Sequence, residues 1–219
     1  MNLKGKNIRV VNKYLNLLKD IFIITIGLFV SSFGTVLFYQ AELGASPMAT
    51  FCDGLHIILD LSYGTTNTLA NVFLIIILIF IKREYINIGT VMCVILIGPF
   101  IDIITMLFNA IDISETSMII RIVFVIIGTI FMGIGLGLYV SVDRGLGALE
   151  ALVKYFCAKT CMSYSKVKIA QDVILVLMGI VLSATIGIGT VIAVFLTGPI
   201  LQKSIKFFTP ILCKEKTKV

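Results

Sequence analysis

The chain has 219 residues, of which 58% are hydrophobic and only 14% are charged. A soluble domain carries about 25% charged residues, so this composition excludes an ordinary water-soluble protein and indicates helices that lie in lipid. The net charge of +6 does not call for nucleic acid, because basic residues beside membrane helices orient a protein in the bilayer.

The first membrane helix is predicted after a basic segment, residues 1–20, which we expect in the cytoplasm. Ile21–Gln40 is a continuous apolar run, and about 20 such residues cross a hydrocarbon core of about 30 Å. Its apolar core continues without a small-residue cleavage site, so we predict a retained helix and not a signal peptide.

A shorter segment, Pro47–Leu59, is too short to cross comfortably and is predicted to be re-entrant or interfacial. It opens with Leu43-Gly44-Ala45-Ser46-Pro47, in which serine suits the cap and proline the first helical position. A bared helix N-terminus attracts anions, so Ser46 is a candidate binding residue, and an ordinary cap is the alternative.

Two further spans, Thr65–Ile81 and Ile88–Leu107, complete a first half that we place at residues 21–112. Asn71 lies in the first of these spans and is a candidate contact for a solute or a polar residue near the membrane edge.

The next polar signals lie in the second of these spans. Gly98 and Pro99 are predicted to break the helix, because proline removes a backbone donor; a discontinuous helix at a site and a simple packing kink are both compatible with this pair. Asp102 follows one turn later. A carboxylate deep in lipid is costly and marks a site by default, unless it reaches the outer interface.

The second half, placed at residues 113–208, has three spans, and residues 209–219 form a basic cytoplasmic tail. A second short segment, Leu149–Ala158, carries Glu150 and Lys154 at a helical i,i+4 spacing that predicts an ion pair. The predicted spans are Met118–Val140, Val167–Thr185 and Ile188–Phe208.

The last two spans contain candidates that match those of the first half. Gln171 and Asp172 lie early in one helix, and Asp172 either serves a site or pairs with a lysine one turn earlier. In the final span Gly198 and Pro199 form the second predicted break, and Gln202 is the counterpart of Asp102.

The two halves repeat one another in sequence. Leu-Gly-Ala, Ser-Tyr, Ile-Gly-Thr-Val and Gly-Pro recur in the same order, at an offset that starts at 103 residues and relaxes through 101 to 100. Each half contains three predicted crossings, so the second half begins on the opposite side of the membrane and the repeats are inverted, as in many secondary transporters. This topology places 17 of the 18 basic residues on one side, which the positive-inside rule assigns to the cytoplasm.

These motifs resemble those of the bacterial YczE-type membrane proteins, which are grouped with YitT- and YyaS-like proteins. The resemblance covers about residues 20 to 205 and rests on Ile88-Gly89-Thr90-Val91, Gly98-Pro99 and their second copies. The family has no assigned biochemical activity, so the resemblance implies a bacterial plasma-membrane location and no substrate.

The sequence thus predicts an all-α polytopic membrane protein with six crossings, two short helices and inverted repeats. The function expected first is a secondary transporter or facilitator of a small solute. The alternatives are a solute-binding subunit that needs an ATPase partner and a non-transporting regulator. The sequence contains no recognisable catalytic motif, metal-binding spacing or cofactor motif, so we expect neither an enzyme nor a bound metal or cofactor. The lipid bilayer is the expected partner. The sequence does not decide whether the protein forms a homo-oligomer.

Overall fold

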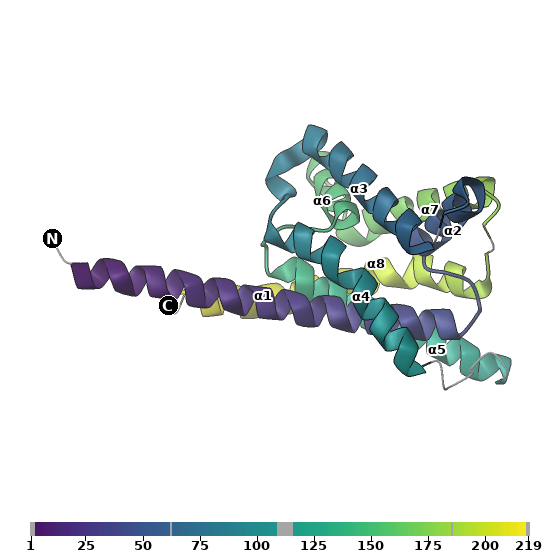
Figure 1. Cartoon of the computed structure of the whole chain (residues 1–219), viewed down its shortest axis with the longest axis horizontal. Helices are drawn as coiled ribbons and strands as arrows, with labels where there is room; N and C mark the ends of the chain where they lie inside the picture. Colours follow the sequence, from purple (N-terminus) through teal and green to yellow (C-terminus); the bar gives the residue numbers. More distant parts are fainter. Residues whose placement is uncertain (1–2, 62, 109–115, 185, 218–219) are drawn as a thin grey trace.

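The computed structural model describes the backbone of residues 3–61, 63–108, 116–184 and 186–217, and the side chains of 14–61, 66, 69–108, 116–184 and 186–212. Over these residues all regular secondary structure is helical, which confirms the all-α prediction (Figure 1). The helices are α1 (Leu3–Gln40), α2 (Pro47–Leu59), α3 (Tyr63–Lys82), the 3-10 turn η1 (Arg83–Tyr85), α4 (Ile88–Phe108), α5 (Met118–Ser141), α6 (Ala148–Thr160), α7 (Tyr164–Val181) and α8 (Ile188–Thr217).

Four of these helices are long and apolar enough to cross a membrane, namely α1, α4, α5 and α8. They contain four of the six predicted spans. The other two predicted spans correspond to α3 and α7. In the described part of the chain, these two helices do not meet the same criteria of length and hydropathy. The short segments are helical too: α2 has the predicted bounds, and α6 begins one residue early and ends two residues late.

The helices that contain the first and last predicted spans extend into the terminal segments. α1 starts at Leu3 and continues without interruption to Gln40, and α8 continues to Thr217. The predicted boundary between the halves, at residues 112 and 113, lies outside the described residues.

Of the two interpretations of the Gly-Pro pairs, a discontinuous helix and a packing kink, the continuous helices fit the kink. Pro99 lies inside an uninterrupted α4, and Pro199 lies inside an uninterrupted α8. Proline removes a single backbone donor, which a packed helix can absorb as a kink without unwinding. Gly98 and Gly198 therefore precede prolines within continuous helices.

The helices form two groups. α1 packs along α5, and α4 and α8 flank this pair. The helices α2, α3, α6 and α7 contact one another on one side of these long helices (Figure 1). Near the C-terminal end of α8, Leu212 packs against the core cluster that contains Ile24 and Leu28 of α1. The end of α8 therefore lies beside α1.

α1 and α5 cross antiparallel through closely apposed glycines. A side chain at Gly27 would meet the Gly135 carbonyl oxygen at 2.8 Å, and one at Gly128 would meet the Gly34 carbonyl oxygen at 2.7 Å. Small residues allow such close backbone approach between membrane helices. Gly27 and Gly128 are 101 residues apart, as are Gly34 and Gly135, so the contact relates equivalent positions of the two halves.

Positive φ angles recur at this offset of 101 in the loops that precede the two short helices. Glu42 and Asp143 both have positive φ (47° and 56°), as do Gly44 and Gly145 (115° and 102°). The offset of 103 predicted from the letters Leu-Gly-Ala is therefore wrong at the short helices, and Ala49, not Ser46 or Pro47, corresponds to Glu150.

The register of α3 and α7 is also corrected. The N-termini of the two helices, Tyr63 and Tyr164, are 101 residues apart. With this offset the burial patterns of the two helices agree, and Asn71 corresponds to Asp172 and not to Gln171.

Matched hydrogen bonds fix the starts of α4 and α8. Gly89 N–H donates to the Arg144 carbonyl at 2.8 Å, and Gly189 N–H donates to the Leu43 carbonyl at 2.8 Å. Each half thus holds the first turn of its last helix against the loop that precedes the short helix of the other half.

Candidate functional site

A cavity of about 240 Å³ lies where the two groups of helices meet. All eight α-helices contribute to its wall. The short helices contribute their first turns, Ser46–Ala49 of α2 and Gly147–Glu150 of α6; the other lining residues are Ser31, Thr35 and Tyr39 of α1, Asn71 of α3, Cys93, Val94, Ile97, Gly98, Ile101 and Asp102 of α4, Met132 and Leu136 of α5, Lys168 and Asp172 of α7, and Thr197 of α8.

The first turns of α2 and α6 begin at the cavity for local reasons. Pro47 is the first residue of α2 and has the fixed φ that suits this position, and Gly147 precedes α6. Ser46 was expected to cap α2, but its side chain makes no capping hydrogen bond. Helix N-termini carry partial positive charge, so both short helices present that charge to the cavity.

Three buried ionisable side chains lie together on the α6–α7 side of the cavity. Lys168 and Asp172 form an ion pair one turn apart on α7 and are 5% and 1% exposed. Glu150, in the first turn of α6, is 6% exposed. Burial raises the pKa of the Glu150 carboxyl, the Lys168 ammonium opposes this rise, and the Asp172 carboxylate adds to it. This buried group therefore has two acids for a single base.

Among the described residues, two that line the cavity each have a buried polar atom without a hydrogen-bond partner. These atoms are Oδ2 of Asp172 and Oγ1 of Thr197, and the Thr197 side chain is 3% exposed. Buried polar atoms are nearly always paired in native proteins, so each of these atoms requires an explanation.

The structure brings together several of the sequence-predicted candidates. Asp102, Asn71, Asp172 and Ser46 all line the cavity, and so does Gly98. Asp102 is exposed while it lines the cavity, so it lies where the cavity reaches the protein surface and not deep in an apolar core.

Other candidates lie beside the cavity and connect helices. Gln171 Nε2 donates to the Leu149 carbonyl at 3.1 Å, and Gln202 Oε1 accepts a hydrogen bond from Ser165 N–H at 2.9 Å. Among the described residues, the cavity wall does not include these two glutamines. It also does not include Pro99, Gly198 or Pro199.

The sequence prediction missed Glu150, Lys168 and Thr197 as residues of the cavity. The predicted Glu150–Lys154 pair is wrong, because Lys154 Nζ pairs with Asp143 at 3.0 Å and Glu150 turns inward. Glu150 could have been found from its place in the first turn of a helix that opens with glycine. Thr197 gave no signal beyond a hydroxyl in an apolar helix.

The two sides of the cavity differ. α7 packs along α8, whereas its counterpart α3 makes little contact with α4. A Cβ at Gly198 would lie 3.0 Å from the Ser165 carbonyl oxygen, but a Cβ at the equivalent Gly98 would meet nothing within 4 Å. The cavity is thus closed between α7 and α8 and open beside α4.

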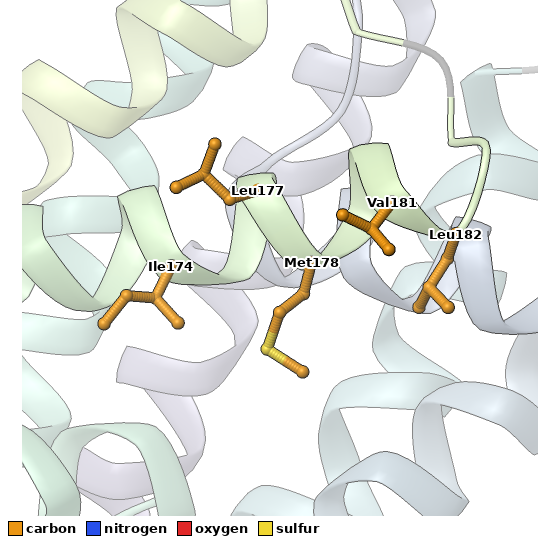
Figure 2. Close-up of a pocket in the computed structure, with 5 residues that line it drawn as sticks. All are labelled: Ile174, Leu177, Met178, Val181 and Leu182. Atoms are coloured by element: carbon orange, nitrogen blue, oxygen red, sulfur yellow. The ribbon is translucent and has the colours of Figure 1, made fainter.

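A second hollow on the surface of α7 is wholly apolar. Figure 2 shows its five lining side chains, which come from the C-terminal part of α7 and the residue after it: Ile174, Leu177, Met178, Val181 and Leu182. Such an aliphatic face suits lipid tails and offers no polar group to a solute.

Comparison with known proteins agrees with a membrane location. The profile of a family described as "Family of unknown function (DUF6198)" matches residues 18–206. The chain is 24% identical over 196 residues to an "Uncharacterized protein" of Haemophilus influenzae, covering 90% of this chain and 86% of the relative. It is 27% identical over 180 residues to the "Uncharacterized membrane protein YczE" of Bacillus subtilis, covering 82% of each.

No solved structure matches the chain. The predicted resemblance to YczE-type proteins is confirmed. Together with the four long apolar helices, the relative's description makes this chain a multi-pass membrane protein.

Proposed function

The chain belongs to the DUF6198 family of unknown function, and from this premise we propose that it is a secondary transporter or facilitator for a small solute that occupies the central cavity. The observation that carries the proposal is the meeting of two short-helix N-termini, of α2 and α6, in one cavity with buried charged residues. Intramembrane charges mark substrate or ion pathways.

Inverted repeats explain how the two short helices reach the same cavity. The antiparallel contact of Gly27 with Gly135 and of Gly34 with Gly128 pairs residues as a two-fold axis across the helices would pair them. Repeats related by such an axis in the membrane plane are common in secondary transporters, with the solute site near the midplane. In this proposal α2 and α6 re-enter from opposite faces without crossing.

Six crossings follow if α3 and α7 span the membrane with α1, α4, α5 and α8. One end of the bundle then holds the Asp20–Arg144 ion pair at 2.6 Å and the contact of Leu146 N–H with the Tyr85 carbonyl at 3.1 Å. At the other end, Arg121 Nε donates to the Ala41 carbonyl at 2.7 Å. The first end carries most of the basic residues, so we place it, and both termini, at the cytoplasmic face of a bacterial plasma membrane.

Single-cysteine labelling checks this orientation. In a variant without the five native cysteines, Glu42→Cys should react fully with a membrane-impermeant maleimide added to intact cells, and Lys159→Cys should react only after the cells are opened. Both positions are exposed, so a difference between them reports the membrane side and not burial. Labelling of position 159 in intact cells would contradict the six-crossing arrangement. A matching test at Glu115 concerns a residue outside the described part of the chain.

Autonomous transport separates this proposal from its alternatives. Proteoliposomes that contain only this chain should accumulate a solute from a defined mixture of small amines, zwitterions and carboxylates, measured by mass spectrometry of the vesicle contents. Uptake that appears only with a co-purified ATPase would identify a solute-binding subunit. Solute binding and uptake that are absent under every condition would favour a non-transporting regulator.

A further inference from the structure

The unpartnered oxygen of Asp172 is the strongest indication of what the cavity holds. Oδ1 of this carboxylate bonds to the Lys168 ammonium, whereas Oδ2 has no partner although the side chain is 1% exposed. A buried carboxylate oxygen without a donor costs free energy. A ligand that donates a hydrogen bond to Oδ2 would remove this penalty.

The hydroxyl of Thr197 supplies a second, independent indication. It comes from a different helix, α8, is 3% exposed, and also lacks a partner while it lines the same cavity. A hydroxyl can accept a hydrogen bond as well as donate one, so a group with several N–H donors can satisfy both oxygens.

The charges around the cavity favour a cation. Asp102, Glu150 and Asp172 line it, and Lys168 is the single basic residue of the described lining. The partial positive charge of about one half at each short-helix N-terminus offsets part of this acidic excess. An ammonium group carries the charge that offsets the rest.

The rest of the wall favours an organic cation over a bare metal ion. Val94, Ile97, Ile101 and Leu136 are aliphatic lining residues, which suit a small hydrocarbon body. An ammonium group also has several N–H donors, which can satisfy the two unpartnered oxygens by hydrogen bonds.

We propose that the cavity binds the ammonium group of a small organic solute, which donates hydrogen bonds to Oδ2 of Asp172 and Oγ1 of Thr197. This inference rests on the proposed function, because it names the class of solute that the cavity takes. The ammonium can belong to a simple amine or to a zwitterion whose carboxylate lies at the α2 N-terminus, where the position equivalent to Glu150 is Ala49 and no acid occupies the first turn.

Binding by the purified full-length chain tests the inference. Isothermal titration would compare ethylammonium, β-alanine and propionate, with NaCl as the ionic-strength control. We expect ethylammonium or β-alanine to bind and propionate not to bind. Stronger binding of β-alanine than of ethylammonium identifies a zwitterion, and equal binding identifies the ammonium alone as the recognised group; both results support the inference.

Three variants locate the binding. Asp172→Asn should weaken ammonium binding by about tenfold or more, the usual effect of losing a hydrogen bond to a charged group. Asp102→Asn is the matched control, because it makes the same chemical change at an exposed position of the cavity and should weaken binding less. Thr197→Val preserves shape, removes an unpartnered hydroxyl and should weaken binding by a few fold, which keeps the test decisive if Asp172→Asn fails to fold.

The outcomes for the ligand class and for transport are separable. Binding of propionate alone, a response to Na⁺ without amine, or unchanged amine binding in folded Asp172→Asn and Thr197→Val would each overturn the ammonium site. Uptake of a solute without an ammonium would overturn the inference and leave the transporter proposal in place. Ammonium binding without uptake in proteoliposomes would support the inference and contradict autonomous transport.

Discussion

Replacing Gly34 with alanine is expected to destabilise the chain strongly. The added Cβ would lie 2.6 Å from the Met132 backbone nitrogen and 2.9 Å from Phe131 Cβ. A backbone atom cannot rotate away, so α1 and α5 would have to separate along their whole contact. Overpacking of this kind costs about 1–3 kcal/mol and occasionally more.

The repeat predicts the same effect at the equivalent residue. In Gly135→Ala the Cβ would lie 2.5 Å from the Gly27 carbonyl oxygen. Gly98→Ala is the matched control, because its Cβ would meet nothing within 4 Å. Thermal unfolding in detergent should show large losses for Gly34→Ala and Gly135→Ala and little change for Gly98→Ala. Equal stability of all three variants would mean that α1 and α5 do not cross at these glycines.

The helices could be predicted from the sequence because apolar runs determine them. The long runs became α1, α4, α5 and α8, and the short ones became α2 and α6, since a helix in lipid needs only length and hydrophobicity to form. The pairing of the halves was harder to predict. Identical letters aligned Gly44 with Gly147, whereas the backbone requires positive φ at Gly44 and Gly145, and only coordinates reveal which glycine of Arg144-Gly145-Leu146-Gly147 makes the turn.

Part of the candidate site could be predicted from the sequence, and part of it depends on the three-dimensional arrangement. Asp102, Asn71 and Asp172 were found because polar residues in apolar helices are few and conspicuous. Glu150 was assigned to a surface pair because i,i+4 spacing with Lys154 does not show which way the helix faces. Thr197 acquires meaning only because it lines the same cavity as Asp172, which is formed by segments far apart in sequence.

The asymmetry between α7–α8 and α3–α4 leads to the last prediction, which concerns access to the cavity. If the protein alternates between two states and has the orientation proposed above, the present state is closed toward the cytoplasmic face, where Gln202 Oε1 accepts a hydrogen bond from Ser165 N–H at 2.9 Å. The start of α4, at Ile88, lies at that same face, so the open region beside Asp102, further along α4, is nearer the outer face. Alternation between such states is the expected mechanism for inverted repeats.

Gly198→Ala should therefore open the cavity to the cytoplasm. Its Cβ would lie 3.0 Å from the Ser165 carbonyl oxygen and 3.3 Å from Ile169 Cγ1, so α7 and α8 would have to separate slightly at this contact, which disfavours the closed arrangement. The readout is labelling of Ser46→Cys, a buried cavity residue, by an impermeant maleimide in inside-out vesicles. We expect labelling to rise several-fold for Gly198→Ala and not for Gly98→Ala, the equivalent change on the open side.

Gln202→Ala tests the same closure without adding a steric clash, because it removes only the acceptor of the hydrogen bond from Ser165 N–H. It therefore distinguishes a movement of α8 from a general loss of stability. A hydrogen bond contributes about 1 kcal/mol, which corresponds to about a fivefold shift in the ratio of two states. Cytoplasmic labelling of Ser46→Cys should rise by about that factor, and labelling from outside should fall, while the unfolding temperature changes little. A rise in labelling from both faces would indicate local unfolding of α8, and unchanged labelling in both Gln202→Ala and Gly198→Ala would refute a cytoplasmic closure between α7 and α8.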